Sequence, residues 1–152
     1  MPDVQGLLAE LYALRGLTAQ GAHVRDGDIL QFSLLDEARA YRWDVRVYSI
    51  AWRIESEADV VVGAGDDGDI LRQAVAIVDG KVLGAVQVEA PSLDTTFVFD
   101  GCRLRIFPVT AKSDPSRWQQ WSLRSPTGRI LDVGPGPSWS WRKRGTGGAD
   151  SS

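Results

Sequence analysis

The sequence contains one cysteine, Cys102, and one histidine, His23, among its 152 residues. A single cysteine cannot form a disulfide within the chain, and it cannot supply the thiolate cluster of a structural zinc site. A single histidine excludes a two-histidine metal site and leaves one imidazole base for any catalytic triad. We therefore predict no catalytic, cofactor-binding or metal-binding residues and no cofactor, and we favour a protein that is not an enzyme. Cys102 is expected to face the core, and His23 to lie on a strand near a turn.

Long apolar runs and an excess of positive charge are also missing from the sequence. No run approaches the roughly 18 residues that a membrane-spanning helix needs. The net charge of -3 gives no long-range attraction to phosphate groups, so neither nucleic acid nor a membrane is expected as a partner. Residues 1–16 lack the basic start and the cleavage site of a signal peptide. We expect a cytoplasmic protein that needs no oxidising compartment.

The overall composition is typical of one soluble globular domain with many turns. Hydrophobic residues make up 43% of the chain and charged residues 24%, which argues against wholesale disorder. The 16 glycines and 7 prolines indicate frequent turns. We predict a single domain over residues 1–142, followed by a polar, glycine-rich tail over residues 143–152 that is disordered.

Apolar residues recur at helical spacing in two segments, residues 7–14 and residues 70–78. An aspartate is placed to cap each segment and a glycine to end it: Asp3 and Gly16 for the first, Asp67 or Asp69 and Gly80 for the second. The spacing predicts two short amphipathic helices.

Most of the remaining chain alternates apolar and polar residues in short runs, as antiparallel strands do. An Asp-Gly pair, a strong hairpin signal, separates two such runs at residues 26–27 and again at residues 100–101. Between Tyr41 and Ile54 the alternation changes phase after Val47, so one flat strand would expose one of the two apolar sets. We predict a bulge or a sharp bend at this point.

Two distant segments, Trp52–Gly65 and Trp121–Gly136, share one layout. In each, a tryptophan opens a short strand, a polar turn follows, and a second apolar run ends in Gly-x-Gly. We predict an internal repeat of a helix plus hairpins, with a first repeat at about residues 1–66 and a second repeat at about residues 67–142. The expected fold class is α+β, with two short helices and mostly antiparallel sheets, open or barrel-like.

One glycine-rich segment, Gly63–Gly68, matches G-x-G-x-x-G between a strand and a helix, as in dinucleotide-binding sites. Asp66, Asp67 and Asp69 would place negative charge where a pyrophosphate binds, so helix capping and turn formation are favoured instead. The same aspartates are compatible with a weak cation site. They do not fit an EF-hand, because the twelfth position of a loop that starts at Asp66 is Ile77.

Six tryptophans are many for a chain of this length. Trp52 and Trp121 hold equivalent places in the two repeats, which indicates core packing. Tryptophan and arginine dominate protein-binding hot spots, and both types cluster toward the C-terminus. The candidate partner-binding residues are Arg117, Trp118, Arg124, Trp139, Trp141 and Arg142. An apolar strand face covered by arginine stems is the simpler alternative.

Five short segments carry a resemblance: WRI at residues 52–54, GAGD at 63–66, LRIFP at 104–108, WSL at 121–123 and GPGPSW at 134–139. They resemble a loosely defined group of small, largely uncharacterised bacterial proteins, some similar to immunity-type proteins near polymorphic toxin loci. The resemblance covers most of residues 16–141. The shared motifs are structural, so the resemblance implies a fold and no active site. This chain departs from the group in having alanine at residue 64, where serine is typical, and in a longer tryptophan-rich C-terminus.

Three hypotheses for function follow from these features. We expect a non-catalytic protein that binds another protein, in the manner of an immunity protein. The alternative is a small-molecule-binding protein or an enzyme with a pocket lined by Trp43, Tyr48, Phe97 and Phe99. The third is a homodimer formed through the edge strand that the alternation at Pro137–Trp141 predicts.

Overall fold

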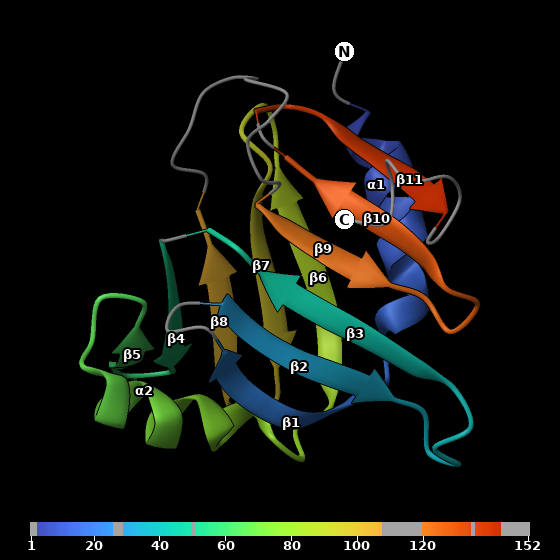
Figure 1. Cartoon of the computed structure of the whole chain (residues 1–152). Helices are drawn as coiled ribbons and strands as arrows, with labels where there is room; N and C mark the ends of the chain where they lie inside the picture. Colours follow the sequence, from blue (N-terminus) through green and yellow to red (C-terminus); the bar gives the residue numbers. More distant parts are fainter. Residues whose placement is uncertain (1–2, 26–28, 50, 108–119, 135, 144–152) are drawn as a thin grey trace.

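A computed structural model describes residues 3–25, 29–49, 51–107, 120–134 and 136–143, and within them eleven antiparallel strands form two sheets (Figure 1). The six-stranded sheet contains, in spatial order, β1 (Thr18–Arg25), β2 (Ile29–Leu35), β3 (Arg42–Val47), β9 (Trp121–Arg124), β10 (Arg129–Val133) and β11 (Trp139–Lys143). The five-stranded sheet contains, in spatial order, β5 (Val60–Gly63), β4 (Trp52–Ser56), β8 (Cys102–Ile106), β7 (Asp94–Phe99) and β6 (Leu83–Glu89). The α+β class is confirmed, and the described strands form two open sheets and not one closed barrel.

Two short helices accompany the sheets, as predicted. Each helix continues into a 3-10 turn: α1 (Val4–Leu11) into η1 (Tyr12–Leu14), and α2 (Gly68–Ala74) into η2 (Val75–Val78). The Asp3 carboxylate caps α1 by accepting the Gly6 N–H at 2.9 Å. Gly16 and Gly80 follow the two turns with φ of 87° and 81°, a conformation that favours glycine. No helix in the described ranges is long and apolar enough to cross a membrane.

Each repeat contributes three strands to one sheet and a hairpin to the other. Strands β1, β2 and β3 of the first repeat are completed by the β9–β10 hairpin of the second repeat. Strands β6, β7 and β8 of the second repeat are completed by the β4–β5 hairpin of the first. The orders β1-β2-β3-β9-β10 and β6-β7-β8-β4-β5 therefore match element for element. Strand β11 is the one described strand without a counterpart.

Backbone hydrogen bonds join the two repeats in a reciprocal pattern. The Gly16 N–H donates to the Leu83 carbonyl at 2.8 Å, and the Gly80 N–H donates to the Ala19 carbonyl at 2.7 Å. The two donors, Gly16 and Gly80, are 64 residues apart, and so are the two acceptors, Ala19 and Leu83. The two repeats are therefore related by an approximate two-fold axis that passes between β1 and β6.

The change of phase after Val47 marks the point where the chain leaves one sheet for the other. Strand β3 ends at Val47 in the six-stranded sheet, and β4 begins at Trp52 in the five-stranded sheet. Between them Ser49 is buried, and its hydroxyl donates to the Phe107 carbonyl at 2.6 Å. Val45 and Val47 before this crossing, and Trp52 and Ile54 after it, are buried in one core. The predicted bend is therefore confirmed.

An aromatic group joins the two sheets inside the core. Phe32 of β2 meets Phe97 of β7 edge-on, with ring centroids 5.8 Å apart, and Phe97 meets Trp121 of β9 at 5.2 Å. Trp121 is fully buried, and its indole N–H donates to the Thr95 hydroxyl at 3.0 Å. Trp52, its counterpart in the first repeat, is also buried, but its indole N–H has no hydrogen-bond partner in the part of the chain described. The indole N–H is therefore hydrogen-bonded in Trp121 and has no described partner in the equivalent Trp52.

We predict that Trp121→Phe lowers the free energy of unfolding by about 1–2 kcal/mol more than Trp52→Phe does. Both changes remove a similar volume from the core. Only Trp121→Phe breaks a buried hydrogen bond, whereas Trp52→Phe removes a buried donor that had no partner. Urea denaturation followed by circular dichroism measures both losses, and equal losses would contradict the prediction.

A chain divided between Asp67 and Gly68 should fold only when the two fragments are present together. Each sheet takes a hairpin from the other repeat, so either fragment alone would expose the apolar face of an incomplete sheet. Co-expressed fragments should elute as one folded 1:1 complex in size-exclusion chromatography. A cooperative unfolding transition in either isolated fragment would show that the exchange of hairpins is not required.

Candidate functional site

A cleft of about 630 Å³ opens at one end of the six-stranded sheet, between α1, the β2–β3 loop and β11. Ala9 and Ala13 line it from the helix and the 3-10 turn, and both are exposed. Trp43 of β3 and Trp141 of β11 contribute aromatic surface, and Pro126 lines it from the β9–β10 turn. The lining is mainly apolar, and the volume falls within the range of roughly 300–1,000 Å³ that ligand pockets occupy.

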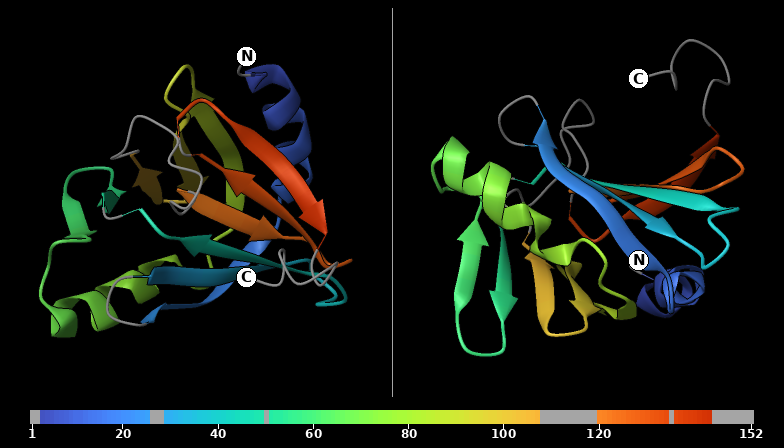
Figure 2. Two further views of the ribbon diagram at one scale, coloured as in Figure 1. Left: turned by 45° about the horizontal axis from the view of Figure 1, so that its top comes forward. Right: turned by 90° about the horizontal axis from the view of Figure 1, so that it is seen from below.

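Strand β11 and helix α1, red and dark blue in Figure 2, come from opposite ends of the described chain. The two tryptophans of β11 fasten the strand to the helix. The Trp139 indole N–H donates to the Asp3 carbonyl at 3.0 Å, and the Trp141 indole N–H donates to the Glu10 carboxylate at 3.1 Å. The Arg129 guanidinium lies over the Trp141 ring, with its Cζ 4.5 Å from the ring centroid. Trp141 is therefore held in place as one wall of the cleft.

The wall opposite α1 is formed by the β2–β3 loop, residues 36–41, and the β9–β10 turn. The Asp36 carboxylate accepts the Tyr41 N–H at 3.1 Å, which ties the two ends of the loop together. Tyr41 is 63% exposed at the rim. In the turn, the Ser125 and Thr127 hydroxyls share a hydrogen bond of 3.0 Å. The walls are thus ordered by bonds of their own, before any ligand enters.

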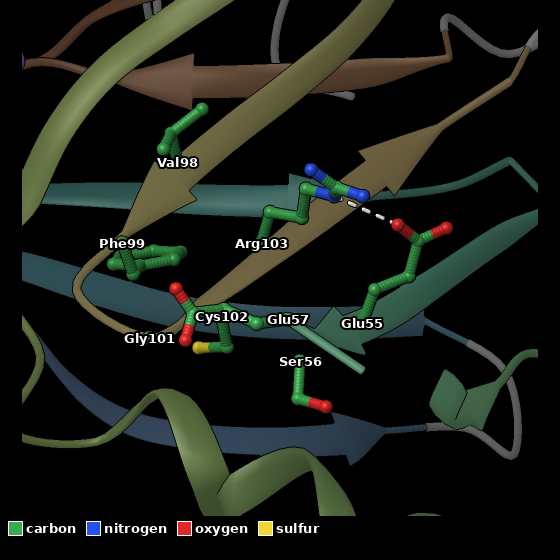
Figure 3. Close-up of a pocket in the computed structure, with 8 residues that line it drawn as sticks. All are labelled: Glu55, Ser56, Glu57, Val98, Phe99, Gly101, Cys102 and Arg103. Carbon is green, nitrogen blue, oxygen red and sulfur yellow. Dashed lines mark hydrogen bonds and ion pairs between the residues drawn. The ribbon is translucent and has the colours of Figure 1, made fainter. Parts of the chain in front are cut away.

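The matching end of the five-stranded sheet is built differently (Figure 3). Its β7–β8 turn consists of Asp100 and Gly101 alone, in place of the loop at residues 36–41. In the described chain, β5 is followed by α2, whereas β10 is followed by the additional strand β11. The pocket at this end measures about 190 Å³ and is lined by Cys102, the counterpart of Trp43. The larger cleft therefore depends on features that only one end possesses.

The predicted partner-binding residues do not share one surface. Trp139 and Trp141 point toward α1, whereas Arg124 and Arg142 lie on the outer face of the same sheet, because successive strand side chains point to opposite faces. The Arg142 Nε also donates to the Asp132 carboxylate at 2.6 Å on that outer face. Two further candidates lie outside the described residues: Arg117 and Trp118. Of the four candidates that the structure describes, only Trp141 lines the cleft.

The aromatic residues predicted to line an alternative pocket are also separated. Trp43 lines the cleft, but Phe97 and Phe99 are 0% and 4% exposed and pack against Phe32 in the core. Tyr48 lies at the crossing between the sheets, where its N–H donates to a carbonyl of the segment before β9.

Several residues that line the cleft were not predicted from the sequence: Glu10, Asp36, Tyr41 and Arg129. The available signal was the longer β2–β3 loop of the first repeat.

The Gly63–Gly68 segment forms a strand end and a turn, as predicted, but the predicted side-chain cap of α2 by Asp67 or Asp69 is not formed. The Asp66 carboxylate accepts the N–H at the end of β5 at 2.8 Å. Asp69 pairs with Arg72, and Asp67 occupies the N-cap position of α2 without a side-chain capping bond. The three aspartates thus occupy separate local environments. Within the described ranges, no three potential metal ligands come together.

The single histidine lies on a strand and the single cysteine faces the core, as expected, whereas the turn predicted at residues 26–27 lies outside the described residues. His23 lies on β1, where its ring Nδ1 is 2.7 Å from the Gly21 carbonyl oxygen. Cys102 faces the core, and burial raises the pKa of its thiol. A thiol in this state is a poor nucleophile at neutral pH.

A second charged site surrounds Glu55 on the outer face of the five-stranded sheet (Figure 3). Its carboxylate bonds Arg53, accepts Arg103 Nε at 2.7 Å and lies 3.6 Å from Arg105 Nη1. The hydrogen bond from Arg53, helped by Arg103 and opposed by burial, lowers the pKa of Glu55 to about 2. The carboxylate therefore stays charged and orders three arginines around it.

Comparison of the chain with models of known protein families, with curated proteins and with solved structures finds no match. What bears on function is thus the chemistry of the cleft itself. Its lining is apolar and aromatic, and it carries two carboxylates, on Glu10 and Asp36, and one guanidinium, on Arg129.

We predict that Glu55→Gln removes much of the loss of stability that the wild type shows between pH 5 and pH 2. Glu55 has a pKa of about 2 in the folded state against an ordinary value of 4.5, so it stabilises the fold above pH 4.5, and this stabilisation is lost as the pH falls toward 2. Its arginine partners are partly exposed, so solvent screening limits the effect to the order of 1–2 kcal/mol.

Urea denaturation at pH 7, 4 and 3 measures this contribution of Glu55. Glu57→Gln, which changes an exposed neighbouring carboxylate, is the matched control and should follow the wild-type profile. Parallel pH profiles for the wild type and Glu55→Gln would contradict the prediction.

Proposed function

We propose that this protein binds another protein and that the cleft beside α1 holds a segment of that partner. One observation carries the proposal: the features that distinguish the two ends of the molecule, the longer β2–β3 loop and strand β11, both line this cleft. A duplicated scaffold needs the elements that both repeats share. Features present in one repeat alone are not required to complete the sheets, so their convergence on one cleft favours a binding role for them.

The residues of the cleft suit a protein segment. Trp43, Tyr41 and Trp141 offer aromatic surface of the kind that dominates protein–protein hot spots. Tyr41 is 63% exposed, so the rim leaves room for a chain to enter and leave. Trp141 is already bound to Glu10, so little side-chain freedom is lost when a partner packs against it. The resemblance to immunity-type bacterial proteins is in line with this proposal.

Binding of a small molecule is the second candidate. The cleft volume of about 630 Å³ and the combination of apolar walls with a few polar groups favour it. A fragment screen by ligand-observed NMR tests this candidate in parallel. Small ligands bound with micromolar affinity, in the absence of any cleft-dependent peptide, would favour it over a protein partner.

We predict that Ala9→Gln weakens the binding of peptides selected against the wild-type protein from a display library by at least about tenfold. Ala9 is an exposed residue of α1 that lines the cleft, and glutamine is an uncharged, good helix former, so the change fills the apolar site without breaking the helix or altering the charge of the cleft. Binding is measured by fluorescence anisotropy with the labelled peptides.

The matched control is Ala76→Gln, which makes the same substitution at an exposed helical position of the second repeat. It should leave every affinity within about twofold of the wild type, because surface changes remote from an interface have small effects. Selected peptides that bind Ala9→Gln as tightly as the wild type would show that the cleft is not the binding site.

A further inference from the structure

Two carboxylates, those of Glu10 and Asp36, line the cleft, and each uses one oxygen in a hydrogen bond to a described residue. One oxygen of Glu10 accepts the Trp141 indole N–H, and one oxygen of Asp36 accepts the Tyr41 N–H. The second oxygen of each carboxylate, Oε2 of Glu10 and Oδ2 of Asp36, has no hydrogen-bond partner among the described residues. Both residues line the cleft. An occupant of the cleft therefore meets two carboxylate oxygens that are not hydrogen-bonded to any described residue.

Aromatic ring faces accompany these carboxylates. Tyr41 and Trp43 line the same cleft as Asp36, and Tyr41 is largely exposed. A cation over such a ring is attracted by the negative face of the π system. Within the cleft the Arg129 guanidinium already makes this contact with Trp141, at 4.5 Å from the ring centroid. Aromatic rings with free carboxylate oxygens are the groups that recognise an ammonium or a guanidinium.

We infer that the partner segment held in the cleft presents a cationic side chain, arginine or lysine, next to apolar residues. This inference rests on the proposed function. A neutral segment would remove water from Glu10 and Asp36 without replacing its hydrogen bonds, which is costly for a carboxylate. An acidic segment would add like charge and would find one cation in the lining, Arg129, which already lies over Trp141. A basic segment satisfies both carboxylates.

Three small probes that share a benzene ring and differ in charge test the inference: benzylammonium, benzyl alcohol and phenylacetate. Their affinities are measured by NMR chemical-shift titration of the wild-type protein. Benzylammonium should bind at least about fivefold more tightly than benzyl alcohol, and phenylacetate should bind most weakly. The preference for the cation should shrink at high salt, because the carboxylates lie in an open cleft.

The double variant Glu10→Gln and Asp36→Asn should reduce the cation preference to within about twofold. Each amide keeps the acceptor oxygen that Trp141 or Tyr41 uses, so the walls of the cleft are preserved while the charges are removed. Glu37→Gln is the matched control, because Glu37 is an exposed carboxylate of the same loop that does not line the cleft. It should keep the wild-type preference.

The outcomes separate the two proposals. Probes or selected peptides that lose binding with Ala9→Gln, but show no preference for positive charge, would overturn the inference and leave the proposed function standing. The same holds if the cleft-dependent peptides contain no arginine or lysine. If neither probe nor peptide binds in a way that Ala9→Gln disrupts, the proposed function fails and the inference fails with it. A cation preference that the double variant abolishes supports both.

Discussion

The exchange of hairpins between the two repeats is the constraint on which the rest of the structure depends. Three strands and one short helix leave the apolar face of a sheet uncovered, and a lone hairpin is barely stable in water. Here each repeat completes the other's sheet, so the two must fold together. The aromatic contacts of Phe32, Phe97 and Trp121 lie where the two sheets meet, and they link strands of both repeats.

This shared scaffold explains why the cleft stands out. The near two-fold relation accounts for ten of the eleven described strands, both helices and the paired tryptophans at residues 52 and 121. It does not account for β11 or for the length of the β2–β3 loop, and both border the cleft. The shared sheets thus support a cleft, and the loop and strand that form its walls occur at one end of the molecule and not at the other. The charged network around Glu55 orders side chains on a separate face.

The local parts of the fold were accessible from the sequence. Helical spacing, the glycines after each helix and the phase change after Val47 all predicted features that the structure contains, because each arises from residues close in the chain. The Gly-x-Gly segments matched less well. When the β9–β10 hairpin is superposed on the β4–β5 hairpin by its strand pairing, Gly134 corresponds to Gly65 and not to Gly63. The two Gly-x-Gly segments are therefore not equivalent, because the pairing between strands, and not the spacing of glycines, sets the register.

By itself, the sequence determined the elements, their duplicated order and the inward-facing tryptophans, since periodicity and turn chemistry act over a few residues. Only the tertiary structure decided which hairpin joins which sheet and where the cleft lies. Trp141 lines that cleft because it reaches Glu10, a residue 131 positions away, while its neighbour Arg142 points to the other face of the sheet. Contacts of such sequence separation depend on the packing of the whole chain, and no local pattern encodes them.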